Sequence, residues 1–268
     1  MDALADNFAR FFDVKPVVTD EQLRLAMELR YQVYCLETGF EDINQHPGGM
    51  ERDEFDSRAV HSLLIHRASG MIAGTVRLVL PEAANPHALF PIEKHCGDAV
   101  RRPVAAALRG QVAEISRFCI SKEFKRRMAE SPSLWGSIDG VTEEDMSQRR
   151  LIPHITVGLF TAIVRMSAQH GIRYWYAVME PSLLRLLTRF GIHFTLIGPA
   201  VEYHGARQPC FADADEVLTE MHRVVPPVWE LITEGGRLWP GQVIQHREIN
   251  SYRDAWPLPF GGPVFAKG

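Results

Sequence analysis

The chain has 268 residues, of which 46% are hydrophobic and 23% are charged, the composition of a folded protein that can bury a sizeable core. Its formal net charge of -4 excludes a global basic field for nucleic acid and a strongly acidic tail. Four widely separated cysteines give neither a zinc signature nor a disulfide framework, and no apolar run reaches the roughly 18 residues of a membrane span. Because the N-terminus also lacks a signal-peptide pattern, we expect a cytoplasmic protein.

The first predicted helix begins at a capping box. Thr19 is the expected N-cap, and Gln22 follows at the spacing that lets the two side chains bond reciprocally to the backbone. Apolar residues then recur on one face to about residue 35. The next segment, 38–57, is rich in glycine and charge and predicts a long loop, and such a loop inside a compact domain is usually functional.

The rest of the chain predicts a mixed sheet with helices. A hairpin is expected at 61–67 and 71–80, and a buried strand at 110–121 follows a proline-rich segment. After a polar insertion at about 122–150, the expected elements are a helix (152–171), a strand (173–179), a helix (181–190), two strands (194–203 and 208–212) and a short helix (217–224). This order favours an α/β layout without a strict β-α-β-α repeat.

Charged residues stand out against these apolar elements. Glu114 and Arg117 interrupt the strand at 110–121, and Arg77 lies in the second strand of the hairpin. Asp53 and Asp56 lie at the end of the long loop. A charge in a sheet core is costly unless it is paired or coordinated, so these residues predict a binding site for a small polar substrate.

Six segments resemble the motifs of one family, in the same order. They are an arginine on the first helix (30–34), an aromatic residue (Phe40), paired aspartates (53–56), an arginine strand (74–78), a Phe-Pro element (89–91) and a Glu-x-Ser-Arg-Phe signature (114–118). The chain therefore resembles the acyl-homoserine-lactone synthase branch of the N-acetyltransferase-like (GNAT) fold. Its insertion after Ser121 and its tail past 215 make it longer than typical lactone synthases. Its overall look, including Phe11-Phe12-Asp13 and Arg58-Ala-Val-His-Ser62, is closer to the long-chain N-acyl amino acid synthases and to the acyltransferases associated with exosortase/PEP-CTERM protein sorting.

The resemblance implies a GNAT-like α/β fold, with a mixed, mostly antiparallel sheet flanked by helices. We expect an N-terminal arm over 1–19, the acyltransferase domain with its insertion over 20–212, and a C-terminal extension over 213–268. The implied activity moves a medium or long acyl chain from a thioester to the amine of a small amino acid or derivative. The product would be an N-acyl amino acid or a signal-like molecule.

Three other functions stay open. An autoinducer synthase would form a lactone and require S-adenosylmethionine. An N-acetyltransferase would turn over with acetyl-CoA alone. A non-catalytic acyl- or lipid-binding module would retain the fold without the reaction.

Glu114 is the candidate proton acceptor. Acyl transfer requires that the amine lose a proton, and a carboxylate in a partly apolar strand has a raised pKa that suits a base near neutrality. The alternative is that Glu114 pairs with an arginine to hold the sheet. Residues three apart in a regular strand face opposite sides, so Arg117, the second candidate catalytic residue, shares a pocket with Glu114 only if the strand bulges.

The resemblance implies such a bulge, with a main-chain amide near Phe118 or Cys119 as the oxyanion donor; Cys119 itself is interpreted as an inert buried thiol. It also implies an acceptor site, whose candidate substrate-binding residues are Arg30, Phe40, Asp53, Asp56, Arg77 and Phe118. The arginines could hold a substrate carboxylate in a two-pronged geometry. The alternatives are a solvated helix face for Arg30 and a turn cap for Asp56.

The acyl donor is expected to dock on basic residues that follow the signature strand: Lys122, Lys125, Arg126 and Arg127. Acetyl-CoA-dependent members have a glycine-rich pyrophosphate loop here, and this chain has none. The cluster favours an acyl carrier protein, with acyl-CoA as the other possible co-substrate, over a solvated charged face. We expect no permanently bound cofactor and no metal, because the histidines, His61 among them, lack ligand spacing.

Overall fold

One mixed sheet carries most of the chain's strands. The computed structural model describes residues 8–97, 100, 104, 106–130, 148–202 and 205–239. The sheet order is β1-β2-β3-β4-β5-β8-β6, and β7 pairs with β8 beside it. The bounds are β1 Phe12–Pro16, β2 Ala59–His66, β3 Ile72–Val79, β4 Val112–Ile120, β5 Tyr174–Met179, β6 Thr195–Leu196, β7 Val201–Glu202 and β8 Ala206–Asp213. Among these pairs β4–β5 is parallel and the others are antiparallel, which confirms the predicted fold class.

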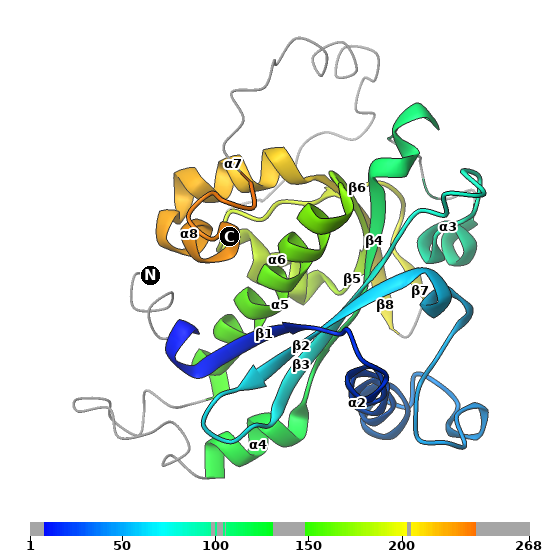
Figure 1. Cartoon of the computed structure of the whole chain (residues 1–268). Helices are drawn as coiled ribbons and strands as arrows, with labels where there is room; N and C mark the ends of the chain where they lie inside the picture. The colour runs from blue at the N-terminus through cyan, green and yellow to red at the C-terminus, as the bar shows by residue number, and fades with distance from the viewer. Residues whose placement is uncertain are drawn as a thin grey trace, which may run out of the picture.

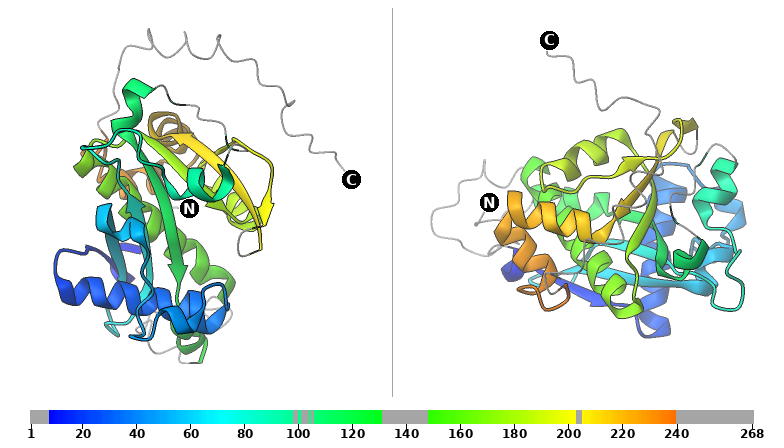
Figure 2. Two further views of the ribbon diagram at one scale, coloured as in Figure 1. Left: turned by 90° about the vertical axis from the view of Figure 1, so that its right-hand side faces the viewer. Right: turned by 90° about the horizontal axis from the view of Figure 1, so that it is seen from above.

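Helices cover both faces of this sheet (Figure 1). Their bounds are α2 Asp20–Tyr31, α3 Pro91–Cys96, α4 Lys122–Glu130, α5 Gln148–His170, α6 Pro181–Thr188, α7 Ala214–Val224 and α8 Pro226–Thr233. The α2 helix packs on β2, β3 and β4, and in the left view of Figure 2 it crosses in front of these strands. The α5 helix packs on β1 to β4 from the other side and carries α8 on its outer surface.

Alternation along β3 and β4 assigns each residue to a face. Val76, Leu78 and Ile115 belong to the main apolar core, together with residues of α5. Successive side chains of a strand point to opposite faces. Arg77 and Glu114 therefore point to the other face, on which α2 and α3 lie.

The capping box and the hairpin are confirmed. The hydroxyl of Thr19 accepts the Gln22 N–H, and the Gln22 side-chain oxygen accepts the Thr19 N–H, each at 3.2 Å. The hairpin turns through Gly70, whose φ of 67° favours glycine. The first helix does not continue regularly to residue 35, because it passes into a π-helix at Gln32–Glu37.

The structure contains two helices, α4 and α8, and one strand, β1, that the sequence analysis did not predict. The α4 helix forms within the polar insertion because Ser121 Oγ accepts the Phe124 N–H at 3.0 Å and the Phe124 side chain is fully buried. The remainder of that insertion, residues 131–147, lies outside the described residues. The α8 helix starts at two prolines, which are tolerated in a first helical turn. The strand expected at 194–203 is divided into β6 and β7.

The described parts of the predicted arm (8–19) and of the predicted extension (213–239) share a core with the predicted domain. Residues 12–16 form edge strand β1, and Phe12 belongs to the same apolar cluster as Val217 of α7 and Ile232 of α8. The boundaries at 19 and 213 stay a prediction. Within the described ranges, no helix is long and apolar enough to cross a membrane.

Candidate active site

The β4 strand bulges at Arg117. Thr75 stands opposite Cys119 while Arg77 stands opposite Ser116, so β4 holds one residue more than β3 over this stretch. Arg117 takes up the extra residue with a φ of 49°, a left-handed conformation that is uncommon outside glycine. The bulge turns the Arg117 side chain to the face that carries Arg77, and the predicted bulge is therefore confirmed.

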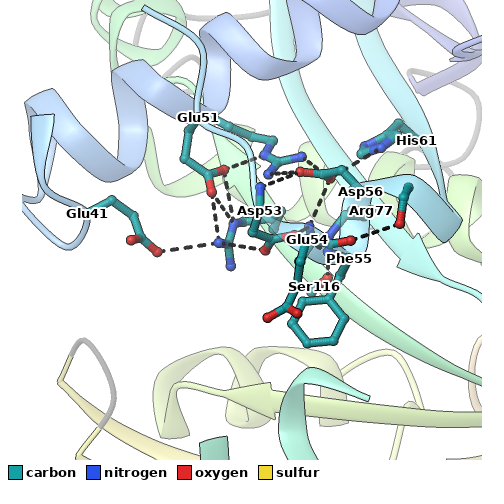
Figure 3. Close-up of polar contacts among 12 residues, drawn as sticks. Glu41, Glu51, Asp53, Glu54, Phe55, Asp56, His61, Arg77 and Ser116 are labelled. Carbon is teal, nitrogen blue, oxygen red and sulfur yellow. Dashed lines mark hydrogen bonds and ion pairs between the residues drawn. The ribbon is translucent and has the colours of Figure 1, made fainter. Parts of the chain in front are cut away.

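Seven charged residues meet on this face, and we call them the acid–arginine cluster: Arg30, Arg77, Arg117, Glu41, Glu51, Asp53 and Asp56. Figure 3 shows the contacts running from Glu41 through Glu51 and Asp53 to Asp56. The cluster joins α2, the loop after it, β3 and β4. Sequence reasoning identified five of these residues but missed Glu41 and Glu51, because an acid in a polar loop has the appearance of a solvated charge.

Arg30 and Arg77 hold the aspartates. Arg30 donates from Nη1 and Nη2 to the two Asp56 oxygens at 2.7 and 3.0 Å and from Nε to Glu51 at 2.5 Å. Arg77 Nη1 donates to Asp53 Oδ1 at 2.6 Å and to Asp56 Oδ1 at 2.9 Å, and its Nε donates to Ser116 Oγ at 2.9 Å. Both arginine side chains are fully buried, so Arg30 does not lie on a solvated helix face.

Arg117 extends the network towards the loop. Its Nη2 donates to Glu51 Oε1 at 2.8 Å, to Asp53 Oδ2 at 3.1 Å and to Glu41 at 3.4 Å. Its guanidinium also lies over the Tyr34 ring, 5.2 Å from the centroid. Burial alone would raise the pKa of Glu51, but the hydrogen bonds and charges of Arg117 and Arg30 lower it to about 2.

Hydrogen bonds between neighbouring residues hold the loop that carries Asp53 and Asp56. Asp53 caps the short 3-10 helix Glu54–Arg58, where its Oδ1 accepts the Phe55 N–H at 2.9 Å. Asp56 Oδ2 returns to accept the Asp53 N–H at 2.8 Å, which completes a capping box. Asp56 therefore caps a turn and also belongs to the cluster. Burial opposes its charge, but the bonds from Arg30 and the charge of Arg77 hold its pKa well below the usual range.

Glu114 lies beside the cluster on the same strand face, with 3% of its surface exposed. Its Oε2 accepts the Ile92 N–H at 2.8 Å, at the start of α3. Burial raises the pKa of Glu114 to about 8, against the opposing effects of the Ile92 hydrogen bond and the Arg77 charge. Among the described contacts no ion pair joins Glu114 to an arginine, so the sheet-holding pair considered from the sequence is replaced by a bond to a helix end.

Three other residues that the sequence analysis considered lie outside the acid–arginine cluster. Phe118 packs against the main core, on the side away from the cluster. Phe40, in the loop after α2, lies under the guanidinium of Arg207, 5.5 Å from its centroid, and Arg207 in turn pairs with Glu180. Cys119 is buried, and burial raises the pKa of its thiol to about 12, so it is an inert thiol at neutral pH.

The basic residues after β4 lie on α4. Lys122 and Arg126 line a pocket of about 440 Å³ together with Gln32, Glu37 and Glu123. Arg127 instead pairs with Glu123 at 2.6 Å, and burial lowers the pKa of Lys125. The four residues therefore share one helix, and two of them face the pocket beside the π-helix.

Comparison with known proteins bears on the class. Residues 29–135 match the family model described as an acetyltransferase (GNAT) domain. No curated protein matches the chain. Among solved structures, TofI in a ternary complex with an inhibitor and MTA aligns with a TM-score of 0.52 and 21% identity, over 81% of this chain and 98% of that one.

Two further structures align over similar lengths. The CoA-dependent acyl-homoserine lactone synthase BjaI, with SAM and isopentyl-CoA, has a TM-score of 0.54 and 15% identity over 81% of this chain and 89% of that one. FeeM, an N-acyl amino acid synthase from uncultured soil microbes, has a TM-score of 0.47 and 15% identity over 80% and 96%. At these identities a structural match shows the fold alone.

The matched domain and the fold point to the same class of protein. The matched range, 29–135, includes every residue of the acid–arginine cluster and Glu114. A GNAT-type acetyltransferase domain over 29–135 within this fold supports an acyltransferase enzyme. Within the described residues, no group of three His, Cys, Asp or Glu side chains is placed to hold a metal ion.

Proposed function

We propose that the chain transfers a medium or long acyl group from a thioester to the amine of a small amino acid or derivative. The observation that carries this proposal is the position of Glu114. It is a buried carboxyl with a pKa raised to about 8, on the strand that bulges and on the face that carries the acid–arginine cluster. A base for an amine needs a pKa near the working pH, and a charged site next to it can hold the substrate.

The candidate chemistry has two parts. Glu114, in its ionised form, accepts a proton from the attacking amine, directly or through water. The amine nitrogen attacks the thioester carbonyl, and the tetrahedral oxyanion is stabilised by a main-chain amide near Phe118 or Cys119, where the bulge breaks the regular pairing of β4. When this intermediate collapses, the C–S bond breaks and the thiol of the donor leaves with the proton that Glu114 accepted. Arg117 supports this geometry from the bulge itself, because its side chain is tied to Glu51 and Asp53.

The acid–arginine cluster favours a cationic acceptor. It contains four carboxylates and three guanidiniums, and each arginine is already bonded to internal carboxylates, so the surplus charge is negative. This arrangement supports binding of the acceptor's ammonium group more than the two-pronged grip on a substrate carboxylate expected from the sequence. Arg77 keeps one buried nitrogen, Nη2, without a hydrogen-bond partner in the described structure, and we assign it to a polar group of the acceptor.

The donor is proposed to approach over α4. Lys122 and Arg126 place two cations at one pocket, where an acidic acyl carrier protein or the phosphates of coenzyme A would be attracted. We favour the carrier protein because no glycine-rich loop follows β4. The bound isopentyl-CoA of BjaI makes acyl-CoA the alternative that must be tested beside it. A cytoplasmic location and a link to exosortase/PEP-CTERM sorting remain hypotheses that the sequence suggests.

The test is a reconstitution with purified protein. Acyl carrier protein and coenzyme A thioesters of several chain lengths are each combined with a panel of amino acids and amines, and products are identified by mass spectrometry. An N-acyl amino acid supports the proposal. Turnover with acetyl-CoA alone indicates an N-acetyltransferase, and an absolute need for S-adenosylmethionine indicates a lactone synthase. Thioester binding without any product would contradict the proposed reaction and favour a binding module.

A further inference from the structure

His61 lies beside the acid–arginine cluster, where the dashed line in Figure 3 marks its ion-pair contact with Asp56, but it forms no hydrogen bond there. It stands on β2 directly opposite Arg77 of β3, which stands opposite Ser116 of β4. Side chains of directly paired residues share one face of a sheet, so the imidazole lies on the face that carries the cluster. Its side chain is 4% exposed.

Asp56 has no free position for this ring. A carboxylate offers about four acceptor positions, and those of Asp56 are taken by two nitrogens of Arg30, by Arg77 Nη1 and by the Asp53 N–H. His61 Nε2 lies 3.6 Å from Asp56 Oδ1, too far for a hydrogen bond. Neither ring nitrogen has a hydrogen-bond partner in the part of the chain that the structure describes.

The unpartnered ring is also held neutral. Burial disfavours its charged form and Arg30 repels it, and together with Arg77 they lower the pKa of His61 to about 4, although Asp56 and Asp53 attract the charge. A neutral imidazole has one N–H donor and one acceptor. A buried donor without a partner costs stability, and an aromatic hydrocarbon ring would fill the position without that cost. His61 therefore has an N–H donor beside Asp56 that forms no hydrogen bond in the described structure.

Of the two arginines on Asp56, Arg77 is the one that can be displaced. Arg30 holds Asp56 through two nitrogens, whereas Arg77 reaches it through Nη1 alone and shares that nitrogen with Asp53. The Asp53 side chain is 24% exposed and is the accessible end of this pair. An ammonium group that binds Asp53 competes for the same carboxylate and shifts Arg77.

We propose that His61 is a positioning residue that replaces Arg77 at Asp56. When the acceptor draws Arg77 away, the Nε2–H of His61 bonds to the vacated position on Asp56 Oδ1 and keeps that carboxylate in place between Arg30 and the acceptor. The role of the acceptor rests on the proposed function. The ability of His61 to take the position that Arg77 vacates depends on the protein alone and can be tested without substrate.

The first experiment removes Arg77 from Asp56 in the unliganded protein. In Arg77→Gln the guanidinium is lost, so we expect the Nε2–H signal of His61, followed by NMR on nitrogen-labelled histidine, to move to the position of a hydrogen-bonded donor. Arg109→Lys is the matched control, because it alters another arginine, bonded to Glu93 away from the cluster. The control should leave the His61 signal where it is in the wild type. A His61 signal that does not move in Arg77→Gln overturns the exchange.

The second experiment uses three replacements of His61. Gln places an amide N–H close to the position of Nε2, Asn places one close to Nδ1, and Phe keeps the ring without polar atoms. We expect His61→Phe and His61→Asn to raise the KM for the acceptor about tenfold, which corresponds to the loss of one hydrogen bond to a charged group. His61→Gln should keep the KM for the acceptor close to that of the wild type. The KM for the acyl donor should not change, and the Tm of His61→Phe should equal or exceed that of the wild type.

The outcomes separate the alternatives. An unchanged acceptor KM in His61→Phe, or equal losses in all three variants with a lowered Tm, makes His61 a packing residue and overturns the proposal. If the wild type transfers no acyl group while the histidine signal shifts in Arg77→Gln, the donor exchange stands and the proposed function fails. If Arg77→Gln does not fold, the comparison of the three His61 variants decides.

Discussion

At the scale of single residues, Glu114 combines a structural contact with the candidate chemistry. Its Oε2 accepts the Ile92 N–H in the first turn of α3, where the N-cap residue Phe90 makes no side-chain cap. A buried carboxyl takes a hydrogen-bond partner, and because this partner is neutral the pKa of Glu114 remains raised. A variant that tests the chemistry must therefore preserve the contact with the helix.

Glu114→Gln meets that requirement, because the amide oxygen can still accept the Ile92 N–H. We expect kcat to fall about 100- to 10,000-fold, as for loss of a general base, with a Tm no lower than that of the wild type. Glu93→Gln is the control: it weakens the buried pair with Arg109 and should lower the Tm while kcat is retained. Steady-state kinetics and thermal unfolding measure both. Full turnover in Glu114→Gln would remove the assignment as base.

The raised pKa of Glu114 also predicts opposite pH trends in activity and stability. Because the carboxylate is the active form, kcat/KM should rise with pH and level off above about 8 in the wild type only. The folded pKa exceeds the ordinary value of 4.5, so the folded state retains a proton that the unfolded chain loses. The wild type should therefore lose stability relative to Glu114→Gln as pH rises from 4.5 to about 8. Parallel pH profiles for the two proteins would contradict this.

At the scale of elements, the bulge in β4 shapes the site. It adds one residue between Ser116 and Cys119, so the side chains after it exchange faces. Arg117 consequently joins the cluster, and Phe118 packs into the main core. The neighbouring strand accommodates the bulge with Gly74, where a Cβ would lie 2.7 Å from the Cys119 carbonyl oxygen.

Gly74→Ala should therefore push β3 and β4 apart. We expect a loss of about 1–3 kcal/mol in the free energy of unfolding, as for other overpacked positions, together with reduced activity. Gly110→Ala provides the control, because a Cβ at Gly110 meets no atom within 4 Å. Chemical denaturation of the two variants measures the difference. Equal stability would show that the strands can adjust at no cost.

The α4 helix carries the prediction that distinguishes the two donors. Reversing both cations at its pocket, in a Lys122→Glu, Arg126→Glu double variant, should raise the KM for an acyl carrier protein about tenfold and weaken its salt dependence. A minimal acyl-pantetheine donor should be used as well as before. Arg223→Glu on α7, where the arginine side chain is 73% exposed, controls for net charge. An equal loss with both donors would remove the carrier-protein hypothesis.

At the scale of the whole molecule, strand β1 and helices α7 and α8 pack into the same main apolar core. Phe12 of β1, Met221 of α7 and Ile232 of α8 are each nearly or fully buried in the cluster that contains α5. The side of the sheet that carries the candidate site is thus supported from behind by segments that lie more than a hundred residues apart in the sequence. Stability and site geometry are coupled through this shared core.

Ile232→Ala should test that coupling. Removing this fully buried side chain should cost about 2–5 kcal/mol and shift a single cooperative unfolding transition without changing its slope. Val224→Ala, at a position with 43% exposure on the neighbouring helix, should cost far less. Unfolding is followed by urea titration with tryptophan fluorescence. Two separate transitions would show that α8 unfolds independently of the sheet.

Much of the fold could be predicted from the sequence because its signals are local. The capping box at Thr19, the turn at Gly70 and the periodicity of α5 each depend on residues within one or two turns of each other. Buried charges are equally visible in a sequence, because an ionisable residue within an apolar run stands out. Glu114, Arg117 and Arg77 were identified in this way. The α4 helix was missed because one capping bond and one buried phenylalanine make a weak pattern.

The membership and geometry of the site were decided by the tertiary structure. Glu51 reaches Arg117 across 66 residues, and His61 comes beside Asp56 only because β2 pairs with β3 in one register. The sequence contained all of these residues, but an acid in a loop and a histidine in a strand have many ordinary explanations. Whether such a group is solvated or buried depends on contacts between distant segments. Those contacts also set its pKa, because burial and neighbouring charges act through space and not along the chain.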